Sequence, residues 1–283
     1  MNETMIVGGC SFTVGHELSD YDKNKLPSKK TWAYYLFKHL SGYVPDIVPI
    51  RQRNPIYVNV ARAGSGNSGI ARRVFDALDY EQNPKKLVVV MWSFLSRYDW
   101  ALAPNRLLEK SHSGVERWAT ITPWDTNHGQ AEAFRTLANS EPEQEGWRNR
   151  RMDMKKANVS SFAEGLYRYG ANQYHEIYLS WKSIIWLQNI LEKKKIPFMF
   201  TLADNSLFYN EMVCHSEQDS FMRALYKEID FTKWFSFGKR MMGFNQWALL
   251  NDYERGTTHP LDKAHQDAVQ LMHKQFRKMA GGR

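Results

Sequence analysis

The stretch that decides the fold is Met5-Ile6-Val7-Gly8-Gly9-Cys10-Ser11-Phe12-Thr13-Val14-Gly15. A short apolar run ends in two glycines, which predicts a buried strand that stops at a tight strand-to-helix turn. Such a turn places Ser11 at the carboxyl edge of a sheet, where open α/β folds bind their ligands. Ser11 is therefore the first candidate for chemistry, provided that the chain also supplies a base and donors for an oxyanion.

Beyond this turn, strands and helices alternate. Strand, helix, strand, helix and strand within the first 92 residues favour a parallel, doubly wound sheet. Further strands are predicted at residues 56–60, 87–92 and 196–202, and helices at 31–40, 70–82, 172–195, 221–228 and 262–279. Residues 231–251 are aromatic and irregular, with room for one short strand. We expect one three-layer α/β/α domain over residues 1–283.

Residues 98–170 break this rhythm. Prolines and glycines interrupt short polar segments that carry four tryptophans, Trp100, Trp118, Trp124 and Trp147. Aromatic residues are scarce in disordered segments, and a long stretch without periodicity inside a compact domain commonly has a function. We therefore expect an aromatic-rich insertion that acts as a lid or an interaction element.

The composition is that of an ordinary globular protein, with 43% hydrophobic residues and a net charge of +8. Because the basic residues are spread out and form no dense block, a nucleic-acid partner is not expected. Two cysteines, Cys10 and Cys214, are too few for a disulfide framework. No apolar run approaches the ~20 residues of a membrane span, and no signal-peptide pattern opens the chain. We expect a protein that is made in a cytoplasm and has no membrane partner.

Three stretches could together form a hydrolytic site. They are Ser11, the loop Gly64-Ser65-Gly66-Asn67, and His259-Pro260 before the last helix. A serine needs a base within hydrogen-bond reach and donors for the oxyanion that forms on acyl attack. The loop offers backbone N–H groups and an amide side chain, and His259 offers the base. The ordinary alternatives are a helix N-cap at Ser11, a plain Gly/Ser/Asn turn and a loop histidine.

These blocks, in this order, resemble the SGNH hydrolase superfamily, which includes the GDSL-like lipases and esterases. The matching positions are Gly9-Cys10-Ser11 with Gly15, then Asn59 with Gly64, and finally His259-Pro260 with Ala264-His265. More narrowly, the Gly-Cys-Ser-Phe-Thr turn, the Ala-Gly-Ser-Gly-Asn loop and the Trp-Ser-x-x-x-Arg segment look like the SGNH-like proteins of tailed phages. The resemblance implies a flavodoxin-like strand order and a serine esterase that needs no cofactor.

The oxyanion hole departs from the pattern of this superfamily. The segment Met91-Trp92-Ser93-Phe94 stands where the superfamily has Gly-x-Asn-Asp, whose Asn donates to the oxyanion. The resemblance therefore implies that the N–H groups of Ser11 and Gly64 act together with either the Asn67 amide or the Ser93 hydroxyl. Cys10 replaces the usual Asp before the nucleophile, and we expect it to be a small buried residue of the turn.

The acid that orients the histidine is missing from its usual place, where this chain has Gly256. Asp252 or Glu254 of the same loop would substitute for it, and otherwise the site is a Ser–His dyad. In the serine-protease template, loss of the orienting acid lowers kcat by up to ~10⁴.

Four further residues are candidates for binding a ligand or acting as a base. Arg97 is either an ion-paired surface residue or a partner for a substrate carboxylate, which its planar fork suits. The pair His16-Glu17 is not expected to bind a metal, because no second histidine follows at helical spacing and there is no Cys/His cluster. His265 is expected to be a packed or hydrogen-bonded residue of the last helix.

Two functions follow from the resemblance. The first is an esterase that removes acetyl or another small acyl group from a carbohydrate. The second is a structural or attachment protein of a phage particle, bound to other phage proteins, which keeps the fold with little or no activity. The discriminating observation is whether a carboxylate lies within about 3.2 Å of the His259 ring.

Overall fold

The structure is a computed structural model that describes residues 4–22, 27–41, 56–103, 108–111, 114–126, 128–129, 148, 152, 154–208 and 220–279. Two residues singled out in the sequence, Trp147 and Cys214, lie outside this part of the chain, as does much of the predicted insertion.

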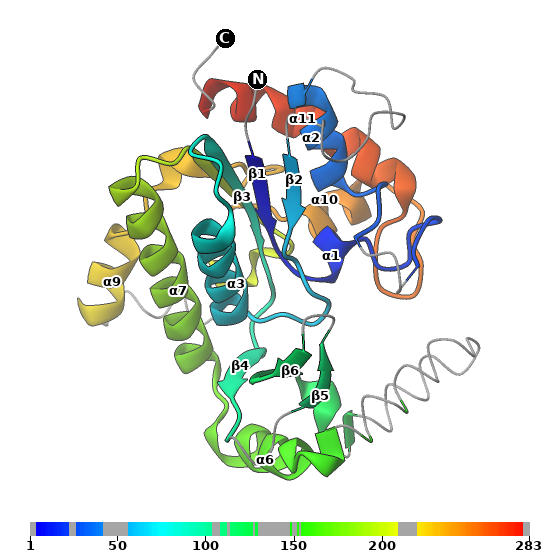
Figure 1. Ribbon diagram of the computed structural model, residues 1–283, viewed down its shortest axis with the longest axis vertical. Coiled ribbons are helices and arrows are strands. Elements are labelled where there is room, and N and C mark those ends of the chain that lie inside the picture. The colour runs from blue at the N-terminus through cyan, green and yellow to red at the C-terminus, as the bar shows by residue number, and fades with distance from the viewer. Residues whose placement is uncertain are drawn as a thin grey trace.

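Four parallel strands form the central sheet, in the order β2-β1-β3-β8 (Figure 1). The strands are β1 (Thr4–Gly8), β2 (Ile56–Asn59), β3 (Lys86–Trp92) and β8 (Phe198–Leu202). This is the flavodoxin-like order for the first four strands. A single parallel bridge between Phe200 and Trp234 extends the sheet at the β8 edge. The predicted parallel α/β sandwich is confirmed.

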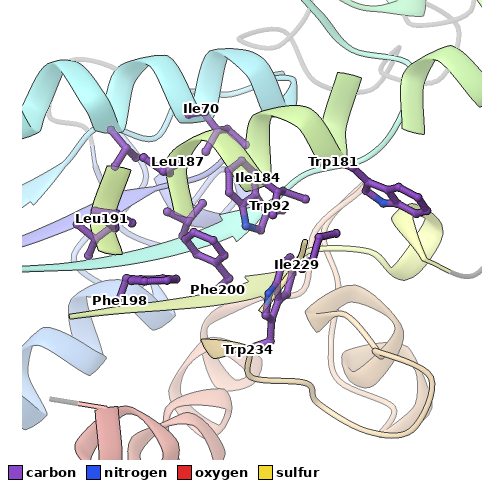
Figure 2. Packing of buried hydrophobic residues seen from close by; sticks show 14 of the residues in the cluster. Ile70, Trp92, Trp181, Ile184, Leu187, Leu191, Phe198, Phe200, Ile229 and Trp234 are labelled. Carbon is purple, nitrogen blue, oxygen red and sulfur yellow. The ribbon is translucent and has the colours of Figure 1, made fainter. Parts of the chain in front are cut away.

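Helices cover both faces of the sheet because successive strand residues point to opposite sides. One face packs against α3 (Asn67–Tyr80) and α7 (Gln173–Lys193), as Figure 2 shows for Trp92, Phe198 and Phe200. The residues between them in the strands, such as Met91 and Met199, pack on the other face. The helices there are α2 (Trp32–Ser41), α10 (Phe244–Leu250) and α11 (Asp262–Met279).

The five helices predicted from periodicity are present. Four of them are α2, α3, α7 and α11, and the fifth is α9 (Ser220–Lys227), predicted at 221–228. Helix α10 falls in a stretch that was expected to be irregular. It is only seven residues long, which is too short for an apolar period to stand out from its aromatic surroundings. Its N-cap is Gly243. The Asn245 N–H donates to the carbonyl of Ala203, the residue that follows β8, at 2.9 Å, and this bond holds the start of α10 at the end of that strand.

The described part of the predicted insertion builds small antiparallel ribbons and a helix of its own. Strand β4 (Tyr98–Ala101) pairs with β7 (Trp118–Ile121), and β5 (Leu108–Ser111) pairs with β6 (Gly114–Glu116). These ribbons and α6 (Val159–Gly165) lie beyond the carboxyl ends of the sheet strands (Figure 1). A small hydrophobic cluster, which includes Tyr98, Ile121 and Ala163, holds the β4–β7 ribbon and α6 together. That this insertion acts as a lid stays a prediction.

Within the described ranges, none of the helices combines the length and the apolar character needed to span a membrane.

Candidate active site

The turn after β1 presents Ser11 as the first residue of a short helix, α1 (Ser11–Val14). The N-cap position belongs to the buried Cys10, so Ser11 does not cap the helix. The helix ends at Gly15 with φ 87°, a left-handed conformation that glycine adopts without strain. The N–H groups of Gly15 and His16 donate to the Ser11 carbonyl at 2.9 Å and 3.1 Å, so the residues after α1 stay close to Ser11.

The structure brings Ser11 and His259 together from opposite ends of the chain. The Ser11 Oγ and the His259 Nε2 lie 2.7 Å apart. Both residues are nearly buried, at 7% and 6% exposed. A hydroxyl this close to an imidazole nitrogen has the geometry that a nucleophile and its general base require.

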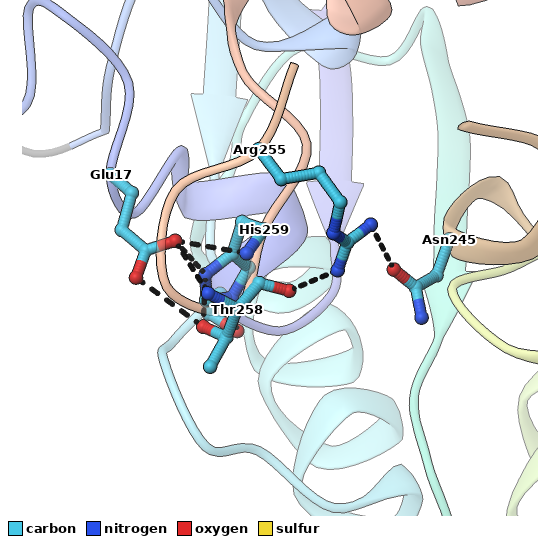
Figure 3. A network of polar contacts seen from close by, with 6 residues as sticks. Glu17, Asn245, Arg255, Thr258 and His259 are labelled. Carbon is cyan, nitrogen blue, oxygen red and sulfur yellow. Dashed lines mark hydrogen bonds and ion pairs between the residues drawn. The ribbon is translucent and has the colours of Figure 1, made fainter. Parts of the chain in front are cut away.

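A carboxylate lies on the opposite side of the imidazole, and it belongs to Glu17 (Figure 3). Its Oε2 is 3.1 Å from the His259 Nδ1, and it accepts the backbone N–H groups of His259 at 2.9 Å and Thr258 at 3.1 Å. Glu17 has φ 68°, a left-handed conformation that is uncommon for a residue with a side chain. This conformation, three residues after Val14, the last residue of α1, turns the carboxylate back toward His259.

These hydrogen bonds keep the Glu17 carboxylate ionised. Burial alone would raise its pKa, but the His259 ring and the Thr258 and His259 N–H groups outweigh burial and lower the pKa to about 2. An ionised carboxylate only accepts hydrogen bonds, so it favours the imidazole tautomer that carries its proton on Nδ1. The lone pair of Nε2 is then directed at the Ser11 hydroxyl, which is the arrangement that a general base needs.

The expectation that Asp252 or Glu254 orients His259 is corrected by this geometry. Both residues are exposed, and among the described contacts neither side chain reaches the imidazole. Glu254 contributes only its backbone carbonyl, which accepts the Leu261 N–H at 2.9 Å.

Gly256 explains why the carboxylate can come from Glu17. A Cβ atom at position 256 would lie 2.6 Å from the Glu17 Oε2 and 3.0 Å from its Cδ. Such distances are far below van der Waals contact, so any side chain at 256 would displace the Glu17 carboxylate. The Glu17 carboxylate therefore fills the space that a side chain at position 256 would need.

The loop that carries His259 is braced from both sides. The Arg255 guanidinium donates to the Thr258 carbonyl at 2.8 Å and to the Asn245 Oδ1 at 3.0 Å (Figure 3). The Gly256 N–H donates to the His259 carbonyl at 2.9 Å, which closes the loop into a tight turn. These bonds hold the imidazole on a restrained backbone.

The oxyanion donors expected from the sequence are only partly free to act. The Asn67 amide is 3% exposed, and both of its hydrogens are used, by the Ser93 carbonyl at 3.3 Å and the Ser180 Oγ at 3.0 Å. Its Oδ1 also accepts the Ser93 N–H at 2.8 Å, so Asn67 fastens the loops after β2 and β3 together. The expectation that the Asn67 amide stabilises an oxyanion is therefore corrected.

The other expected oxyanion donors are the N–H groups of Ser11 and Gly64 and the Ser93 hydroxyl, and each has a hydrogen available to donate. Within the described chain, the backbone N–H groups of Ser11 and Gly64 donate to no other group. The Arg62 N–H donates to the Gly9 carbonyl at 3.2 Å, which holds the loop of Gly64 beside the Ser11 turn. The Ser93 Oγ accepts from the Arg97 guanidinium at 2.8 Å, and its own proton remains available to donate.

Arg97 contacts the site through Ser93 and through a row of aromatic rings. Its guanidinium carbon is 4.8 Å from the centre of the Phe94 ring. Phe94 packs on Phe12 at 5.7 Å, and Phe12 packs on the His259 ring at 4.6 Å between ring centres. Two aromatic rings therefore connect the Arg97 guanidinium to the imidazole by packing. Its role in holding a substrate carboxylate stays a prediction.

Two further histidines lie near the imidazole. His265 is fully buried, accepts the Trp32 N–H on its Nδ1 at 3.1 Å and packs on Phe244, which makes it a hydrogen-bonded core residue. Burial, with the charge of His259, lowers its pKa to about 3. His16 lies edge-on to the His259 ring, with 5.2 Å between ring centres.

Comparison with known proteins adds a distant likeness in fold. No protein-family model matches the sequence, and no curated protein matches it. Among solved structures, the chain is similar to a psychrotrophic esterase from Pseudoalteromonas, with 11% identity, 98% coverage of each chain and a TM-score of 0.45.

Two other similar structures are an acetylxylan esterase from Geobacillus stearothermophilus and a phospholipase A1 from Streptomyces albidoflavus. The first is 10% identical with a TM-score of 0.38, and it matches 99% of this chain and 94% of its own. The second is 11% identical with a TM-score of 0.37, and it matches 97% of this chain and 99% of its own. Likeness at this level does not assign a substrate or a reaction to this chain.

The low pKa of Glu17 gives a pH-dependent contribution to stability. A carboxyl whose pKa is lower in the folded than in the unfolded protein stabilises the fold above its unfolded value, here 4.5, and loses that contribution as the pH falls toward about 2. We expect Glu17→Gln to unfold more easily than the wild type at pH 7, by at most about 3 kcal/mol, with the difference shrinking below pH 4. Urea unfolding of both proteins from pH 7 to pH 3 measures this. A difference that grows on acidification would contradict it.

Proposed function

We propose that the protein is a serine hydrolase of carboxylic esters. The observation that carries the proposal is the continuous chain from the Ser11 Oγ through the His259 imidazole to the Glu17 carboxylate, with contacts of 2.7 Å and 3.1 Å. A serine, a base and an orienting acid in this order are what acyl transfer through a covalent intermediate requires.

The proposed reaction follows from these contacts. The His259 Nε2 takes the proton of the Ser11 hydroxyl as the oxygen attacks the ester carbonyl. The N–H groups of Ser11 and Gly64, with the Ser93 hydroxyl, donate to the oxyanion. The imidazolium then protonates the departing alcohol, and an acyl-enzyme remains. Water, deprotonated by the same nitrogen, attacks the acyl-enzyme and releases the acid.

We further propose that the substrate carries a small acyl group, such as acetyl, on a carbohydrate. The nearly buried Ser11 hydroxyl favours a short acyl chain, because a long one would need a wider opening. In the insertion beyond the carboxyl edge of the sheet, Trp100 and Trp124 are 47% and 40% exposed. Such flat, amphipathic rings suit contact with sugar rings.

The proposal is tested with p-nitrophenyl acetate, butyrate and octanoate, followed by acetylated xylooligosaccharides. We expect hydrolysis of the acetate, a kcat/KM at least about tenfold lower for the octanoate, and release of acetate from the sugar. Failure to hydrolyse any of the esters would contradict the proposed reaction. Hydrolysis that increases with chain length would contradict the proposed substrate.

The alternative role as a phage structural protein depended on an impaired site. Its main support in the sequence was the missing acid at Gly256. Glu17 supplies a carboxylate 3.1 Å from the imidazole, inside the 3.2 Å named above as the discriminating distance. The altered segment Met91-Trp92-Ser93-Phe94 and, more weakly, the basic, aromatic-rich composition still favour this alternative, and the ester assays above distinguish it from the esterase.

A further inference from the structure

The side chains of His16, Glu17 and His259 form a cluster of metal-ligating groups at the active site. Each offers one ligand atom, and these atoms lie within 4.8 Å of one another. Two imidazole nitrogens and one carboxylate oxygen are a donor set that zinc takes in proteins, with a fourth position left for water. Sequence spacing could not indicate this cluster, because His259 comes from the other end of the chain.

His16 has a ring nitrogen that the protein itself does not use. Its Nδ1 is buried and has no hydrogen-bond partner in the described chain. The ring is held between Tyr21, at 4.8 Å, and His259, at 5.2 Å between ring centres. Burial, with the charge of His259, lowers the pKa of His16 and so favours the neutral form, which is the form that binds metals. His16 therefore has a buried ring nitrogen without a partner and belongs to a group of three ligand residues, and a bound metal ion would give such a nitrogen a partner.

Glu17 also retains a free acceptor. Its Oε2 accepts the His259 and Thr258 backbone N–H groups, whereas in the part of the chain that the structure describes its Oε1 is approached only by the Thr258 hydroxyl, at 3.4 Å. One oxygen can therefore bind a cation while the other stays fixed to the loop. Zinc bonds of about 2.0–2.2 Å place ligand atoms roughly 3.5 Å apart, so the three side chains need to close by about 1 Å.

We propose that His16, Glu17 and His259 form an inhibitory site for Zn²⁺ or a similar transition-metal ion. The inhibitory effect rests on the proposed function, whereas metal binding does not. The nitrogen of His259 that faces Glu17 is Nδ1, so the metal binds there. The proton of the neutral imidazole then moves from Nδ1 to Nε2, and no proton is lost from the ring. With a proton on Nε2, His259 cannot accept the Ser11 proton, and hydrolysis stops until the metal is removed.

The binding is measured by calorimetric titration of Zn²⁺ into the metal-free wild type and Ser11→Ala. We expect one ion per chain in both proteins, and no binding of Mg²⁺, which prefers oxygen ligands. His16→Gln should weaken Zn²⁺ binding at least about 100-fold, because it removes a direct ligand. The matched control is His273→Gln, which alters the His39–His273 ring pair (4.9 Å between ring centres) and should change affinity by no more than about twofold.

The second readout is the ratio of p-nitrophenyl acetate hydrolysis with Zn²⁺ to hydrolysis with EDTA. We expect a low ratio for the wild type and His273→Gln, and a ratio near one for His16→Gln. Absence of Zn²⁺ binding to the wild type, equal binding by His16→Gln, or binding that leaves hydrolysis unchanged would overturn the proposal. If the wild type binds Zn²⁺ at this cluster but hydrolyses no ester, the proposed function fails while the metal site stands.

Discussion

Replacing Ser11 by alanine is expected to lower kcat for p-nitrophenyl acetate by about 10⁶, to the level of the remaining oxyanion donors and binding contacts. The reason is that the hydroxyl 2.7 Å from the His259 Nε2 is the group that forms the covalent intermediate in the proposed reaction. The measurement is the steady-state rate of wild type and variant at saturating substrate.

The control is Ser68→Ala, whose hydroxyl pairs with the Ser183 hydroxyl at 2.9 Å between two helices. We expect its kcat to stay within about threefold of the wild type, since this pair belongs to helix packing. A Ser11→Ala variant that folds and keeps more than a tenth of the wild-type rate would show that another group is the nucleophile.

Replacing Glu17 by alanine is expected to lower kcat by up to ~10⁴. Without the carboxylate, the imidazole loses the partner that fixes its tautomer and stabilises its charged form. The same measurement on Asp252→Asn and Glu254→Gln should give changes of no more than about twofold, because both residues are exposed and neither reaches the ring. A large loss in either of these variants, with Glu17→Ala unaffected, would restore the sequence-based expectation.

Because the Glu17 carboxylate fills the space next to position 256, the orienting acid could be supplied from position 256 instead of position 17. Glu17→Ala removes the carboxylate next to the imidazole, and the Cβ of a residue at 256 would lie 2.6 Å from the position that the Glu17 Oε2 occupies in the wild type. We therefore expect Glu17→Ala with Gly256→Asp to recover roughly 10²-fold of the lost kcat. In the wild-type background, Gly256→Asp should instead lower kcat, because two carboxylates then compete for one space. No recovery in the double variant would mean that the backbone at 256 cannot aim an acid at His259.

The fold was predictable because each buried strand is a short, continuous run of apolar residues. Runs such as Leu87-Val88-Val89-Val90-Met91-Trp92 lie between helical patterns, and right-handed connections leave few ways to arrange them. Helix α10 was not predictable in this way. It has only seven residues, and its own Phe244 and Trp247 bury it in the core without forming a recognisable apolar period.

The candidate site was predictable only where the chain keeps a local pattern. Ser11 follows a strand and His259 precedes a helix, and these positions imply convergence at the carboxyl edge of a parallel sheet. Glu17 has no such pattern, since its role depends on a left-handed turn and on the missing side chain at Gly256. The role of Asn67 was not predictable either, because its amide hydrogens bond to Ser93 and Ser180, which are distant in the sequence.

The most direct test of the Ser11–His259–Glu17 arrangement is covalent labelling with a fluorophosphonate, followed by peptide mapping of the labelled residue by mass spectrometry. The account predicts one adduct per chain, on Ser11, that forms much more slowly in Glu17→Ala and is absent from Ser11→Ala. A wild-type protein that stays unlabelled, or an adduct on any other residue, would contradict it.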